Sequence, residues 1–503
     1  MSVSHEQISR SRLLVYGLVV VVATLVLLEL GARLVEPEVY RALREFRLAD
    51  ALAEYKLWQQ ALFLSFGGAH QPDPDLLWHF RPRMRQPLFT TNSRALLTAE
   101  EFEYDKPPNT IRILLLGDSS PVGLGLKSRD EAFGETAARL HQQKWRGLKN
   151  IEFINAAVSG YSSEQARRFL AIEGIRYQPD YVVCYLGNND GSINGYLSDR
   201  EIFAAQDWSF RMRTVFDRSA LYRLMRSLLS PVLADVRSAE SGLPKVRLSP
   251  TEFRENMCAI ISLSREVGAT TICINPPIPL RWPAGLQFKL FAHMADSAGQ
   301  WVVADPIQRN LDRPAAYCLD STMLNRTYGD LDPYVREVIS SAYADSGALD
   351  SIETFYLGKL ISAPDDPVLL NNLGVAYWRQ GKLRQAVDFF QRSIACDSVF
   401  VVPRYNLGIT IYGLGEAEHA IDILQETADR DSYSLRIKTP YRQALFTAVA
   451  QCGGVLLDGA ALFAAQDNER LFIDHCHPTP AGHRLLAERL AAVIDSLGKI
   501  NLP

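Results

Sequence analysis

Several common signatures are missing from this 503-residue chain. Its 53 Lys and Arg are outnumbered by 57 Asp and Glu, and no block of basic residues stands out. The formal net charge of -4 provides no basic field that would hold a phosphate backbone, so we predict no nucleic-acid partner. Gly-x-Ser-x-Gly is also absent, which argues against the nucleophile elbow found in many serine esterases.

Cysteine is sparse and irregularly placed, and no two cysteines are spaced as Cys-x-x-Cys; the residues are Cys184, Cys258, Cys273, Cys318, Cys396, Cys452 and Cys476. This spacing predicts neither a zinc site nor a disulfide framework. Several of these cysteines fall in apolar runs, where the residue acts as a small buried hydrophobe, and their number sits uneasily with an oxidising compartment.

We do not expect residues 474–477 to form a metal site, although Asp474, His475, Cys476 and His477 all carry ligand atoms. Four consecutive residues rarely converge on one ion, and the sequence holds no second cluster. We therefore expect no metal and no cofactor.

One long apolar run lies near the N-terminus, at residues 13–28. With the residues after Glu29 added, it reaches the ~20 residues that a bilayer requires, provided that Glu29 lies near the headgroups. We predict a transmembrane anchor, with a cleaved signal peptide and a buried helix as alternatives; no small-residue cleavage site follows the run. The arginines after the run do not decide orientation, because large domains translocate regardless of such charges.

Five short apolar runs alternate with segments of helical spacing; they are residues 111–116, 151–154, 181–186, 270–275 and 455–458. We predict helices over residues 131–145, 163–177 and 250–267. Strands that alternate with helices imply right-handed crossovers and a parallel sheet. The sequence therefore predicts a three-layer α/β/α fold, with its chemistry at the carboxyl ends of the strands.

A 34-residue period interrupts this alternation between the fourth and fifth runs. Leu373-Gly374, Tyr377, Ala386 and Phe390 recur 34 residues later as Leu407-Gly408, Ile411, Ala420 and Leu424. Together with a degenerate earlier copy, the pattern resembles tetratricopeptide repeats over residues 333–434. We predict an all-α insertion that is a candidate module for binding a protein partner or a structural buttress.

The predicted domain order follows from these features and from a chain length that favours two or three domains. Residues 38–64 have helical spacing, and residues 71–108 are Pro-rich and irregular. We predict an apolar, basic helix over residues 221–230, which is either an amphipathic helix packed on the sheet with a solvated face or a segment that covers the site or touches lipid. The predicted segments are the tail and anchor 1–35, a collar 36–110, the first part of the α/β core 111–280 with a helical insertion 191–249, a connector 281–332, the repeats 333–434 and the second part of the core 435–503.

Polar motifs follow the first three apolar runs and precede the last helix. They are Gly117-Asp118-Ser119, then Gly160, then Gly187-Asn188-Asn189-Asp190, and finally Asp474-His475-Cys476-His477. Each motif alone is an ordinary turn or helix cap. In this order they resemble the SGNH hydrolases, also called the GDSL esterase and lipase family, over roughly residues 111–277 and 436–497. The departures are Ser120 and the doubled Asn188-Asn189, and neither removes a functional group.

The resemblance implies an SGNH, flavodoxin-like fold and assigns roles to residues. Ser119 would be the nucleophile, His477 the general base and Asp474 the acid that orients it, with His475 as the competing base. The backbone N–H groups of Ser119 and Gly160 and the side-chain amide of Asn189 would form the oxyanion hole. Asp118 would shape the serine turn without transferring a proton.

The expected function is a membrane-anchored, extracytoplasmic or periplasmic serine esterase acting on a carbohydrate O-acetyl or lipid ester. Acyl transfer to a polysaccharide hydroxyl is an alternative, because the same triad serves both reactions. A noncatalytic repeat scaffold in the cell envelope with a vestigial hydrolase fold is another.

Overall fold

The computed structural model of the protein describes residues 10–51, 69–85, 89–225, 245–281 and 349–498, apart from 147, 196, 206–211, 213–214, 217–218, 223, 432–434, 467 and 474. The chain divides into two compact units. One consists of Met1–His79 with Phe203–Leu243, and the other of Phe80–Ile202 with Pro244–Pro503. Each is described by itself.

The second unit contains a five-stranded sheet in which every pairing is parallel. Its strands lie in the order β4-β3-β5-β8-β9. They span Asn150–Asn155 (β4), Thr110–Gly117 (β3), Tyr181–Tyr185 (β5), Thr270–Asn275 (β8) and Val455–Asp458 (β9). Numbered along the chain, this is the flavodoxin-like order. All residues of β3 and β5 are buried, as expected of a parallel sheet covered on both faces.

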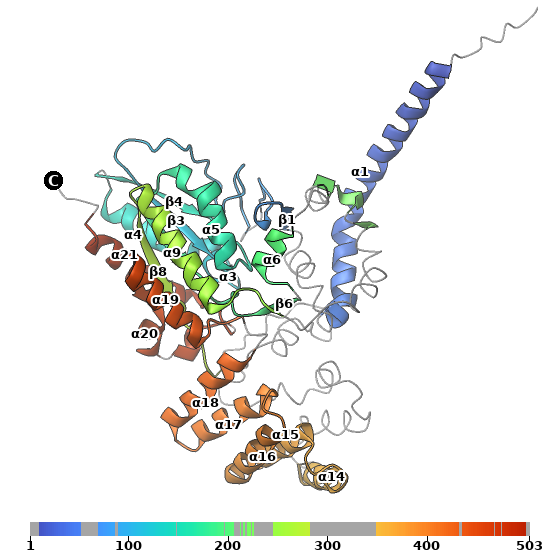
Figure 1. Ribbon diagram of the computed structural model, residues 1–503, viewed down its shortest axis with the longest axis vertical. Coiled ribbons are helices and arrows are strands. Elements are labelled where there is room, and N and C mark those ends of the chain that lie inside the picture. Colours follow the sequence, from blue (N-terminus) through green and yellow to red (C-terminus); the bar gives the residue numbers. More distant parts are fainter. Residues whose placement is uncertain are drawn as a thin grey trace, which may run out of the picture. The chain divides into compact units, whose positions relative to one another are not determined.

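Helices cover both faces of this sheet. On one face, α4 (Phe133–Lys144) packs against α21 (Pro480–Ser496). On the other, α5 (Ser163–Ile172), α9 (Pro250–Glu266) and α19 (Thr439–Cys452) lie side by side (Figure 1). The predicted three-layer fold is confirmed.

The two helix layers pack against alternate side chains of β3. A Cβ on Gly134 of α4 would lie 2.8 Å from Leu115, whereas one on Gly174 would lie 3.0 Å from Leu114. Neighbouring strand residues point to opposite faces, so the sheet buries both sets. The close approach at Gly174 accompanies the early end of α5, since the predicted helix over 163–177 breaks into α5 and the 3-10 turn η3 (Gly174–Tyr177).

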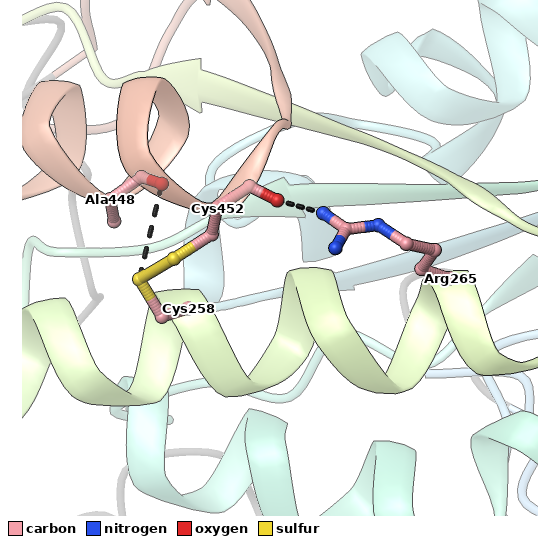
Figure 2. Close-up of a disulfide and its surroundings, with 4 residues drawn as sticks. All are labelled: Cys258, Arg265, Ala448 and Cys452. Atoms are coloured by element: carbon pink, nitrogen blue, oxygen red, sulfur yellow. Dashed lines mark hydrogen bonds between the residues drawn. A yellow bond between two sulfur atoms is a disulfide. The ribbon is translucent and has the colours of Figure 1, made fainter.

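A disulfide joins Cys258 of α9 to Cys452 at the end of α19 (Figure 2). Arg265 lies about two helical turns after Cys258 on α9, and its guanidinium donates to the Cys452 carbonyl. The expectation of no disulfide is therefore wrong. Its two cysteines are 194 residues apart in the chain, and only the packing of α9 against α19 brings them together. Cys184 and Cys273, which fall in apolar runs, are buried, as expected.

Among the residues described between β8 and α19, five helices follow one another: α14 (Leu349–Ser362), α15 (Pro367–Arg379), α16 (Leu383–Cys396), α17 (Val401–Gly413) and α18 (Ala417–Arg430). α15 packs on α16, and α17 on α18. The repeated glycines lie where paired helices approach closely, because a Cβ would come within 2.6 Å of Phe390 at Gly374 and 2.7 Å of Leu424 at Gly408. Residues 333–348 of the degenerate copy lie outside the described residues.

The first unit contains the long helix α1 (Arg10–Ala51). Its Val15–Val35 segment, with a mean hydropathy of 2.4, is long and apolar enough to cross a membrane. Near the end of this segment the Glu29 carboxylate accepts hydrogen bonds from Ser219 Oγ at 2.6 Å and from the backbone N–H of Ala220 at 3.0 Å. Of the predicted helices over 38–64 and 221–230, residues 52–64, 223 and 226–230 lie outside the described residues.

The Pro-rich collar is less irregular than predicted. It holds a two-stranded sheet of β1 (His70–Asp73) and β2 (Leu77–Phe80). The Asp73 carboxylate closes the turn between them by accepting the backbone N–H of Asp75 and of Leu76, both at 2.9 Å. The polar, Pro-containing sequence of β1 conceals this hairpin because it lacks apolar alternation.

Candidate active site

Ser119 lies immediately beyond the carboxyl end of β3. Asp118 caps the short helix α3 (Ser119–Val122), and its carboxylate accepts the Ser120 N–H at 2.9 Å. Gly117 is required at the strand end, since a Cβ there would lie 2.4 Å from Pro121. β3 lies between β4 and β5, where the strand order reverses, and ligands of doubly wound sheets bind at this switch point.

His477 is presented by a tight loop before α21. The Ile473 N–H donates to the His477 carbonyl at 2.8 Å, and Thr479 caps the helix with Pro480 in its first turn. Nε2 of His477 lies 2.7 Å from Oγ of Ser119. A second bond, 3.1 Å from Ser120 Oγ to the Cys476 carbonyl, ties the two loops together. The structure therefore brings together two candidate residues 358 positions apart.

Asp474 and His475 are the other two residues of the predicted acid-base group. Asp474 lies outside the described residues, so its bond to His477 stays a prediction. The His475 ring stands edge-on to that of His477, with 6.3 Å between centroids. Its carbonyl accepts from Nε of the buried Arg436 at 2.9 Å, which anchors the loop.

The candidate oxyanion residues lie on loops linked to the serine turn. Gly160 has a φ of 79°, which favours glycine, in a turn closed by the Tyr161 N–H donating to Val158 at 3.1 Å. The Val158 N–H in turn donates to the Gly117 carbonyl at 3.0 Å. Nδ2 of Asn189 donates to the Tyr161 carbonyl at 3.1 Å. An amide nitrogen carries two hydrogens, so this bond accounts for one of them.

Two buried carboxyl groups flank these loops. Burial raises the pKa of Asp118 to about 6, against the opposing effects of the Ser120 N–H bond and the nearby His477. Burial also raises the pKa of Asp190 to about 6, although that carboxylate accepts the Ser163 N–H at 2.9 Å. The ionisation state of these two carboxyl groups therefore contributes to the electrostatic field around Ser119 and His477.

His483 is a structural histidine behind this site. Burial lowers the pKa of His483 to about 3, with repulsion by His477 as a smaller cause. Its Nδ1 accepts the Phe133 N–H at 3.2 Å. It therefore stays neutral and joins α21 to α4.

The segment that directly follows the repeats was not indicated by any motif, yet its residues bond to the loops that carry the candidate residues His477 and Asn189. Besides the Arg436 bond to His475, the Ile437 N–H donates to Oδ1 of Asn188 at 3.1 Å. Lys438 Nζ donates to the Gly191 carbonyl at 2.8 Å. Isolated basic residues after a helix carry no local signal of such a role, and only the position after the repeats distinguishes them. Across the described part of the chain, no group of three or more His, Cys, Asp or Glu side chains is arranged to hold a metal ion.

Comparison with known families gives one match. Residues 368–396 match the tetratricopeptide repeat family. A tetratricopeptide repeat is thereby confirmed over these residues, and the bounds 333–434 stay a prediction. A comparison with curated proteins finds no match.

Several solved structures are similar to the chain. TesA is 18% identical with a TM-score of 0.20, and the match covers 33% of this chain and 62% of TesA, so the chain spans less than two thirds of that protein. A putative GDSL-like lipase from Parabacteroides merdae is 10% identical with a TM-score of 0.31, over 76% of this chain and 95% of the lipase. A variant of Axe2, an acetyl xylan esterase from Geobacillus stearothermophilus, is 10% identical with a TM-score of 0.30, over 76% of this chain and 94% of that protein.

Proposed function

We propose that the protein is a serine esterase in which Ser119, His477 and Asp474 form the catalytic triad. The observation that carries this proposal is the 2.7 Å separation of His477 Nε2 and Ser119 Oγ at the carboxyl edge of the sheet. A serine hydroxyl is a poor nucleophile until a base accepts its proton, and this distance suits the transfer.

The reaction begins when Ser119 Oγ attacks the ester carbonyl carbon while His477 takes the hydroxyl proton. The N–H groups of Ser119 and Gly160 and the second amide hydrogen of Asn189 then stabilise the tetrahedral oxyanion. His477 returns the proton to the leaving alcohol, and a water repeats the sequence on the acyl-enzyme. Asp474 accepts the other imidazole N–H and stabilises the imidazolium.

The acyl group is, in this proposal, an O-acetyl group on a carbohydrate or the acyl chain of a lipid ester. Replacing water by a polysaccharide hydroxyl in the second half-reaction gives acyl transfer without any change of residues. Product analysis with and without a polysaccharide acceptor separates hydrolysis from transfer, and a series of ester chain lengths defines the acyl pocket.

A membrane-anchored, extracytoplasmic location is part of the proposal. The Val15–Val35 helix supports an anchor, because its side chains are mostly apolar and only 6% of the residues in its most apolar window are buried. The Cys258–Cys452 disulfide supports an oxidising compartment such as the periplasm. The tetratricopeptide repeats are the candidate surface for an envelope protein partner. Protease accessibility in intact and permeabilised cells tests the orientation.

A fluorophosphonate probe tests the nucleophile. We expect it to label Ser119 in the full-length protein and not the Ser119→Ala variant. His477→Ala should abolish ester hydrolysis, whereas His475→Ala should retain most of it; the reverse result would move the base to His475. If the folded parent protein turns over no ester while its repeats capture a partner, the scaffold function replaces this one.

A further inference from the structure

A closed network of buried polar side chains lies beside the Gly160 turn. Arg247 and Asp199 are both fully buried, and Nη2 of Arg247 lies 2.7 Å from Oδ2 of Asp199. Arg247 follows β7 (Lys245–Val246), and Asp199 begins α6 (Asp199–Ala204). The ion pair therefore joins the two ends of the segment inserted after β5. The backbone joins them as well, because the Asp199 N–H donates to the Arg247 carbonyl at 2.9 Å.

Both members of the pair also reach the turn that follows β4. Nη1 of Arg247 donates to the Gly160 carbonyl at 2.5 Å. Nη2 of Arg247 donates to Oε1 of Gln165 at 2.7 Å, and the same oxygen accepts the Ser162 N–H at 3.1 Å. Oδ2 of Asp199 accepts from Ser162 Oγ at 2.6 Å. The network thus holds the start of α5 as well as the turn before it.

These bonds fix the peptide plane between Gly160 and Tyr161. Arg247 holds its carbonyl, and Val158 accepts its N–H. The N–H group of Gly160 belongs to the preceding peptide, so the fixed plane and the positive φ of Gly160 together set its direction. The next carbonyl, that of Tyr161, accepts from the side chain of Asn189. Two of the three proposed oxyanion donors consequently depend on this one turn.

A contribution to folding stability does not explain the buried Arg247–Asp199 ion pair well. Taking two charges out of water is costly, and apolar replacements of buried ion pairs are often neutral or stabilising. A guanidinium offers donors in a rigid fork, so it can hold a carboxylate and a carbonyl at once in one geometry. Geometry is what an oxyanion hole requires, because its donors act only where the negative charge develops.

We propose that Arg247, oriented by Asp199, is a positioning residue for the oxyanion hole, which it serves by fixing the Gly160–Tyr161 peptide. The inference rests on the proposed esterase function. Arg247 touches the turn and not the substrate, so its loss should lower kcat with little change in KM.

The test replaces the pair by apolar residues of similar volume, as Arg247→Met with Asp199→Leu, in the full-length protein. With p-nitrophenyl acetate we expect kcat to fall roughly 10- to 100-fold, as for a displaced catalytic contact, while KM stays within about threefold. Arg247→Lys, which keeps the charge but not the fork, should recover part of the kcat that a single Arg247→Met variant loses.

A matched control lies at the opposite end of β3. Arg112 is equally buried, pairs with Glu152 at 2.5 Å and donates to the Tyr177 carbonyl at 2.7 Å. Arg112→Met with Glu152→Leu should leave kcat unchanged. The inference is overturned if the Arg247 and Asp199 double variant keeps kcat within about twofold of the parent, or if the control loses as much activity. A folded parent without ester turnover removes the proposed function and this inference together, whereas a fully active double variant removes only the inference.

Discussion

The Cys258–Cys452 disulfide allows the most quantitative prediction. Replacing both residues by Ala removes a crosslink that closes a loop of 194 residues in the unfolded chain. Chain-entropy arguments assign a loop of this length about 5 kcal/mol of stabilisation at 25 °C. Both cysteines are only half-buried in the native state, so lost packing adds little. The effect should therefore arise almost wholly from greater freedom of the unfolded chain.

Urea unfolding of the full-length protein, followed by tryptophan fluorescence, measures this difference. We expect the unfolding free energy of the double variant to be lower by about 5 kcal/mol, and its m-value to be slightly larger because its unfolded state is more open. In thermal unfolding, its midpoint temperature should fall by on the order of 10 °C. Reductant should lower the stability of the parent to that of the double variant. It should leave the double variant unchanged.

The matched control is Cys396→Ala, because Cys396 is an exposed thiol outside the disulfide. It should unfold like the parent. The reasoning is refuted if the double variant is as stable as an oxidised parent whose Cys258–Cys452 peptide is found by mass spectrometry. Recovery of both thiols by alkylation of the unreduced parent would also remove the structural support for an oxidising compartment.

Two further predictions concern the serine turn and the repeats. Because burial raises the pKa of Asp118 to about 6 from 3.8, the unfolded state ionises first, and this group costs stability as pH rises through that window. Asp118→Asn, which keeps an acceptor for Ser120, should therefore exceed the parent in unfolding free energy by up to about 3 kcal/mol near pH 8 and match it near pH 4; an equal difference at both pH values would contradict this. In the repeats, Gly374→Ala should destabilise by about 1–3 kcal/mol because its Cβ would lie 2.6 Å from Phe390, as thermal unfolding would show. The control Gly358→Ala, also helical but with open space around it, should stabilise by up to about 1 kcal/mol, and equal effects at both sites would exclude overpacking as the cause.

The elements of the α/β core were accessible to sequence reasoning because their signals are local. Apolar runs bounded by turn residues predicted both ends of β3, β4, β5, β8 and β9 to within one residue. The 34-residue period predicted the helical pairs around Gly374 and Gly408, since the period itself reports a repeated packing unit. Where polar residues stand among the strands, as in β1, the local signal fails and the hairpin was missed.

The candidate site residues were identified because their motifs follow one another in the order that is typical of the SGNH hydrolases. Ser119, Gly160, Asn189 and His477 each look like a cap or a turn residue when taken alone. The role of Asp474 stays a prediction.

The sequence by itself determined which segments become the strands of the parallel sheet, where the repeats lie and which side chains are candidates for chemistry, because these depend on periodicity and turn propensity within a few residues. Only the tertiary structure decided that His477 Nε2 meets Ser119 Oγ, that Cys258 pairs with Cys452 and that Arg247 reaches Gly160. These contacts join residues 87 to 358 positions apart. Which distant groups meet is set by strand order and helix packing, and no local pattern in the chain records that outcome.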